Sequence, residues 1–159
     1  MLERILPRSF DNSYRGYGLA VWLMIPIVAL RLATGLPSLF MGQLVAQGAH
    51  HVPIGAFPPQ AVELLGLLFA RSGLAMVVLA LFCTLVLVRY RAMIPLTYVL
   101  LLLDHGGRAF LLVKEATVTG ASSATVVGFV LFSLTVIGLI LSLLGGSGGA
   151  SALRGRAQR

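Results

Sequence analysis

Four long apolar stretches constrain this chain more than any other feature. They cover residues 19–45, 61–88, 93–113 and 125–144, and each has the roughly 20 mostly apolar residues that a helix needs to span a bilayer. Hydrophobic residues make up 58% of the 159 residues and charged residues 11%, whereas soluble domains average about 25% charged residues. Such a chain cannot cover a water-facing surface with polar groups, so the sequence predicts an integral membrane protein.

Short segments that disfavour helices separate the four stretches. Residues 47–60 contain two glycines and three prolines, residues 89–91 read Arg-Tyr-Arg, and residues 114–123 are largely polar. Glycine, proline and clusters of small polar residues are typical of turns and loops. The sequence therefore predicts an all-α fold, a polytopic membrane protein built as a four-transmembrane-helix bundle over residues 18–145.

Basic residues indicate how the helices are oriented, because Lys and Arg accumulate in the cytoplasmic loops of membrane proteins. Segment 47–60 contains neither Lys nor Arg, and Lys114 alone lies at the edge of the loop after the third stretch. The segments on the opposite side of the membrane carry Arg4, Arg8, Arg15, Arg89, Arg91, Arg154, Arg156 and Arg159. Both termini are therefore expected in the cytoplasm.

The segments that flank the bundle are expected to differ in character. Residues 1–17 combine apolar side chains with three arginines, which predicts an amphipathic arm lying at the cytoplasmic membrane surface. Residues 146–159 begin with a tract rich in Gly and Ser and end with three arginines, which predicts a flexible, basic cytoplasmic tail.

Ionisable side chains inside the predicted spans form the candidate ligand-binding site. A charge at the centre of a bilayer costs at least about 2.5–3.5 kcal/mol, so these groups must pair with one another or line a wet cavity. Helical spacing places Asp104 and Arg108 on one face, one turn apart. We therefore expect the first three helices to form one buried polar cluster that opens away from the cytoplasm. Its predicted members are Arg31, Glu63, Arg71, Asp104, His105 and Arg108.

The charge balance of this cluster leaves several functions open. Three arginines face two carboxylates, and an uncompensated buried guanidinium attracts an anion, a carbonyl group or a chain of waters. One interpretation is a site for an anionic or carbonyl-bearing small molecule, such as a quinone or a lipid. Another is that the salt bridges only hold the helices together. A third is proton or electron transfer.

Other functional classes lack the residues that they require. Cys83 is the single cysteine, so the chain has no internal disulfide and no cysteine-based zinc site. His50 and His51 are adjacent, but no nearby ligand in the sequence completes a metal site. The basic residues are scattered between apolar runs, which argues against a nucleic-acid partner. No complete set of catalytic residues is present, so no catalytic residue is assigned and the cofactor is left unknown.

Three short runs resemble the DoxX-like family of small membrane proteins. They are Leu-Arg-Leu-Ala-Thr-Gly at 30–35, Phe-Met-Gly at 40–42 and Ala-Val-Glu-Leu-Leu-Gly at 61–66. The resemblance implies a four-helix protein of the bacterial inner membrane, with Arg31 and Glu63 as a polar pair. Some relatives are linked to quinone-coupled sulfur oxidation or quinone stress, mostly as accessory subunits. Gln43 stands where the family often has lysine, and the run at 104–108 is not part of the family pattern.

These observations predict a non-catalytic membrane accessory protein that binds a small ligand, such as a quinone or a lipid, in its polar cluster. One alternative is a structural subunit that packs against a larger respiratory or photosynthetic complex. Another is a transporter or membrane enzyme that works as an oligomer. The expected partners are the lipid bilayer and either other membrane subunits or further copies of this chain.

Overall fold

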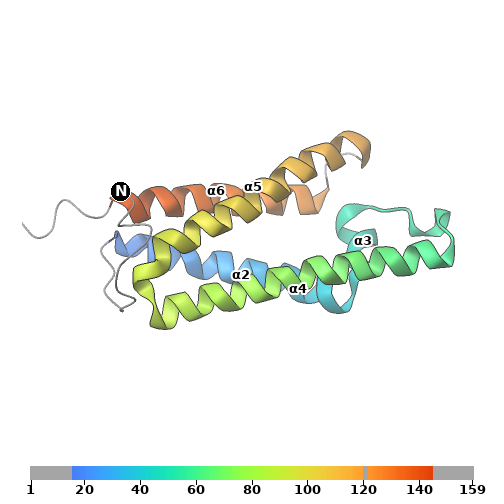
Figure 1. Ribbon diagram of the computed structural model, residues 1–159. Helices are drawn as coiled ribbons and strands as arrows, with labels where there is room; N and C mark the ends of the chain where they lie inside the picture. Colours follow the sequence, from blue (N-terminus) through green and yellow to red (C-terminus); the bar gives the residue numbers. More distant parts are fainter. Residues whose placement is uncertain (1–15, 120–121, 145–159) are drawn as a thin grey trace, which may run out of the picture.

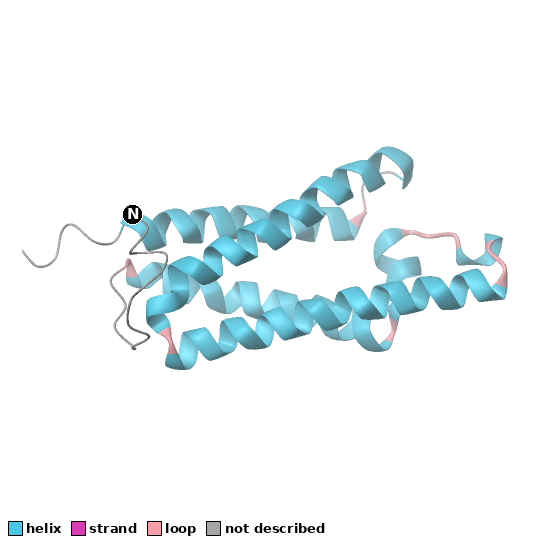
Figure 2. Ribbon diagram, viewed as in Figure 1, coloured by secondary structure: helices cyan, strands magenta, loops and turns pink. Residues whose placement is uncertain are grey.

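The computed structural model describes residues 16–119 and 122–144, and these residues form helices with no strand among them. The predicted all-α class is therefore confirmed. Figure 2 shows that short connections join the helices. The predicted tail, and the predicted arm apart from Gly16 and Tyr17, lie outside the described residues. The elements labelled in Figure 1 and their connections are α2 (Gly18–Phe40), α3 (Gly42–His50), η1 (Ile54–Ala56), α4 (Pro59–Arg89), η2 (Arg91–Met93), α5 (Ile94–Thr119) and α6 (Ser123–Leu144).

Three of the described helices, α2, α4 and α6, are long and apolar enough to cross a membrane. This finding is compatible with an integral membrane protein. Helix α5 carries Asp104, His105 and Arg108, which lower its hydropathy, and it is not among these three. The fourth predicted span, over 93–113, therefore stays a prediction.

The helices form two hairpins that diverge along the molecule. Helix α2 packs along α4, α5 packs along α6, and α2 also contacts α6. Figure 1 shows that α4 and α5 meet at the turn that joins them and then separate. The start of α2, this turn and the end of α6 lie at one end of the molecule, and α3 lies toward the other.

The apolar core fills the end at which the hairpins meet. On α5, the buried residues Ile94, Tyr98, Leu101 and His105 recur at helical spacing, as expected for one face of a packed helix. The hydroxyl of Tyr98 donates a hydrogen bond of 2.6 Å to the carbonyl oxygen of Ala20. The core therefore fixes α5 against the first turns of α2. The polar residues of both helices lie further along, beyond this core.

Glycines bring α4 into close contact with α2 and with α3. A Cβ atom added to Gly73 would lie 2.7 Å from the carbonyl oxygen of Gly35, and one added to Gly42 would lie 2.5 Å from the carbonyl oxygen of Gly66. Both distances are too short for a real side chain, so only glycine fits. Small residues at such contacts let helix backbones pack tightly in a membrane.

The first predicted span, 19–45, is not one continuous helix. The chain breaks at Met41, whose backbone (φ −132°, ψ 42°) is not helical. Pro37 has no backbone N–H, so it cannot donate a hydrogen bond within the helix. The helix ends four residues later, where the Met41 N–H donates to the Pro37 carbonyl oxygen at 2.7 Å. The chain then continues as α3, which contacts both α4 and α6. Helix α3 thus bridges part of the gap between the hairpins.

Candidate functional site

An ion cluster connects α2 to α5 just beyond the apolar core. The Nη2 group of Arg31 donates to Oδ2 of Asp104. The Nε–H of Arg108 donates to both carboxylate oxygens of Asp104, at 3.2 and 3.1 Å. The Arg31 side chain is 1% exposed, and those of Asp104 and Arg108 are each 28% exposed. The structure thus brings together three residues predicted from the sequence, and two guanidinium groups share one carboxylate.

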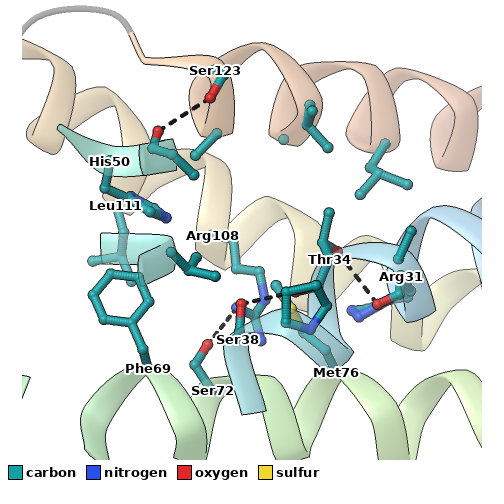
Figure 3. A pocket seen from close by; sticks show the side chains of 18 of the residues that line it. Arg31, Thr34, Ser38, His50, Phe69, Ser72, Met76, Arg108, Leu111 and Ser123 are labelled. Atoms are coloured by element: carbon teal, nitrogen blue, oxygen red, sulfur yellow. Dashed lines mark hydrogen bonds between the residues drawn. The ribbon is translucent and has the colours of Figure 1, made fainter. Parts of the chain in front are cut away.

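Arg108 also joins the two hairpins. Its Nη1 group donates a hydrogen bond of 3.0 Å to the hydroxyl of Ser72 on α4, and Figure 3 shows the side chain extending to this serine. Because α4 and α5 otherwise diverge, this contact spans the gap between them. Ser72 was not predicted, since a single serine in an apolar helix carries no signal of its own.

His105 lies on the same face of α5 and is held by α6. Its Nδ1 atom lies 2.8 Å from the hydroxyl oxygen of Thr135, and that hydroxyl donates to the carbonyl oxygen of Leu131 at 2.7 Å. A hydroxyl has only one proton to donate, so Nδ1 must carry the proton of the His105–Thr135 bond. In the neutral ring, Nε2 is therefore the atom with the free lone pair.

Two buried polar atoms of this cluster lack a hydrogen-bond partner among the described residues, namely Nε of Arg31 and Nε2 of His105. His105 is 4% exposed, and Arg31 is buried still more completely. Buried polar groups in native proteins almost always have a partner, so an orphaned one calls for an explanation. Here Nε of Arg31 is a donor, and Nε2 of His105, in the neutral ring, is an acceptor.

A cavity of about 570 Å³ extends from this cluster between the diverging hairpins, within the range of small-molecule sites. Polar side chains line its inner end, next to the ion cluster. Mostly apolar side chains line the part that lies further from the cluster. Figure 3 shows Arg31, Thr34, Ser38 and Arg108 around it. Its polar lining comprises Arg31, Thr34, Ser38, His50, Ser72, His105, Arg108 and Ser123. Its apolar lining includes Leu65, Leu68, Phe69, Met76, Leu111 and Leu131.

Helix α3 and the start of α6 form the outer end of the cavity. The rings of His50 and Phe69 meet edge to face, with centroids 5.0 Å apart, and both residues line the cavity. The hydroxyl of Ser123 donates to the carbonyl oxygen of Ala49 at 3.3 Å. His51 is exposed and ends α3 in the left-handed conformation. In the described part of the chain, no three His, Cys, Asp or Glu residues are grouped to hold a metal ion.

Glu63 and Arg71 do not join the cluster, which corrects the expectation that the first three helices contribute charges to one site. Both side chains are exposed on α4, and neither lines the cavity. Helix α4 has 31 residues and is about 46 Å long, whereas a hydrocarbon core is about 30 Å thick. Glu63, four residues from Pro59 at the start of so long a helix, therefore needs no burial.

Comparison with protein-family models, with curated proteins and with solved structures finds no match to this chain. The resemblance to the DoxX-like family therefore stays a prediction. The polar pair that it implies, Arg31 with Glu63, does not form, because Arg31 pairs with Asp104 and Glu63 is exposed.

Proposed function

We propose that this chain is an integral membrane accessory protein whose cavity binds a small amphiphilic ligand, such as a lipid or a quinone. In this proposal α5 is the fourth membrane span, and both termini face the cytoplasm of a bacterial cell with the protein in the inner membrane. The cavity then lies in the half of the bundle that faces away from the cytoplasm. The ligand's polar group lies at the ion cluster and its apolar part lies against the outer walls.

The pairing of charges on α5 supports its placement in the membrane. Asp104 lies ten residues after Ile94, which is about 15 Å along the helix and hence near the middle of a 30 Å core. Isolated charges at that depth would be costly, but Asp104 has two arginine partners. Polar side chains inside membranes typically face the bundle interior and pair with one another, as these do.

The observation that carries the proposal is a mostly apolar cavity whose inner end is lined by Arg31 and His105, two residues that each have an unpaired buried polar atom. If the salt bridges served only to hold the helices together, neither the cavity nor the unpaired Nε and Nε2 atoms of Arg31 and His105 would be needed. Small-molecule sites are mostly apolar, with a few convergent polar groups that fix the orientation of the ligand. This cavity has that composition.

The test is native mass spectrometry of the detergent-extracted protein, with extraction and identification of co-purified small molecules. Val127 lines the cavity, whereas its neighbour Val126 is exposed. Val127→Trp fills the cavity and should remove the bound mass. Val126→Trp adds the same side chain outside it and should leave the bound mass in place.

A wild-type protein that carries no small molecule, or one that loses it equally in both variants, would overturn the proposal. Arrival of an empty protein with large unrelated subunits would favour the structural-subunit alternative, with the charges acting only to hold the helices together.

A further inference from the structure

We infer that the cavity selects a carboxylic acid head group on an acyl chain, so that its ligand is a long-chain fatty acid or a similar acyl acid. This inference rests on the proposed function and narrows it to one chemical class. It follows from the unpaired polar atoms of Arg31 and His105, two residues that line the inner end of the cavity, from the charge of the ion cluster and from the apolar side chains that line the rest.

The two unpaired atoms require opposite partners. The Nε–H of Arg31 is a donor and needs an acceptor. The Nε2 atom of His105 carries a lone pair, because Thr135 fixes the proton on Nδ1, and it needs a donor. A carboxylic acid offers both on adjacent oxygens. One oxygen accepts from Arg31, and the carboxyl proton lies in a hydrogen bond between the other oxygen and His105 Nε2.

Membrane head groups that lack a proton to donate satisfy only one of these atoms. A phosphodiester, a carboxylic ester and the carbonyl of an oxidised quinone are all acceptors without a proton to donate. Each could pair with Arg31, but each would set an acceptor against the lone pair of His105. Leaving a buried polar atom unpaired is unfavourable, so these groups should bind more weakly than an acid of the same chain length.

The charge of the cluster separates an acid from an alcohol. Arg31 and Arg108 together carry two positive charges against the single negative charge of Asp104. An alcohol can donate to Nε2, but it brings no charge that the surplus guanidinium can attract. A carboxyl group can share its proton with the imidazole and so present a negatively charged oxygen to Arg31, and charge-assisted hydrogen bonds are the stronger kind.

The outer cavity suits an acyl chain. Leu65, Leu68 and Leu111 line it beyond the polar end. Residues of both α4 and α5 line this part, and the inference places the route of the acyl chain toward the lipid between these two helices. A chain inserted along this route would lie against apolar side chains while its head group reached the ion cluster.

Ligands of matched chain length test the inference on the purified, delipidated full-length protein. The probes are palmitic acid, hexadecanol, methyl palmitate and a palmitoyl lysophospholipid, each measured by equilibrium binding in the same detergent. Palmitic acid should bind at least about tenfold more tightly than each of the others, which corresponds to one hydrogen bond to a charged group.

Two pairs of variants locate the binding atoms. His105→Asn keeps an amide where Nδ1 bonds Thr135 but removes Nε2, and it should lower palmitic acid affinity about tenfold. His105→Gln places an amide where Nε2 lies and should lose less affinity. Arg31→Lys keeps the positive charge beside Asp104 but removes Nε–H, and it should also weaken binding. Arg71→Lys makes the same change at an exposed site outside the cavity and should leave affinity unchanged.

The outcomes separate this inference from the function on which it rests. If the ester or the lysophospholipid binds as tightly as the acid in a manner that Val127→Trp abolishes, the inference is overturned and the proposed function stands. The same holds if His105→Asn binds the acid like wild type. If none of the four probes binds and native mass spectrometry finds no bound molecule, both are overturned.

Discussion

At the scale of single residues, Asp104 is the group on which the ion cluster depends. It is the shared partner of Arg31 and Arg108, so Asp104→Asn would leave two positive charges without a counter-charge at a largely buried site. Removing one partner of a buried ion pair typically costs about 3–5 kcal/mol. We expect the free energy of unfolding, measured by titration with a denaturing detergent, to fall by about that amount.

The matched control for this change is Glu63→Gln. It converts an acid to its amide on the exposed side of α4, where substitutions usually alter stability by less than about 0.5 kcal/mol. Equal stability of the two variants would contradict the role given to Asp104.

At the scale of elements, the contact between α2 and α4 depends on glycine. A Cβ atom at Gly73 would lie 2.7 Å from the Gly35 carbonyl oxygen, so Gly73→Ala must push the helices apart. Overpacking of this kind costs about 1–3 kcal/mol, and we expect that loss in detergent unfolding. Gly48→Ala is the control, because nothing lies within 4 Å of a Cβ atom there. A Gly73→Ala protein as stable as this control would contradict the close contact.

At the scale of the whole molecule, the distribution of arginines predicts which end faces the cytoplasm. A cysteine introduced at Gly55, in the segment that lacks Lys and Arg, should react with a membrane-impermeant maleimide added outside intact spheroplasts. A cysteine introduced at Ala157, in the predicted cytoplasmic tail, should react only after permeabilisation. The native Cys83 is fully buried and need not be replaced. The reverse labelling pattern would overturn the proposed topology.

The sequence indicated which charged residues lie together on α5 because helical spacing within one helix is enough to place them. Asp104, His105 and Arg108 share one face of α5 through helical spacing alone, and the structure places all three near Arg31. Glu63 and Arg71 do not join the cluster as expected, because both are exposed. Hydropathy marks a charge as lying within an apolar stretch, but it does not show which face of a long helix packs against its neighbours.

The composition of the chain by itself determined that it is helical and apolar enough for a membrane, because hydropathy and helix length are properties of a local stretch of residues. Only the tertiary structure decided which residues meet. The break at Met41 turns α3 across the gap, and the rotation of α6 brings Thr135 to His105. These contacts join residues distant in sequence, and they depend on how the helices pack against one another. Periodicity within one helix carries no record of that packing.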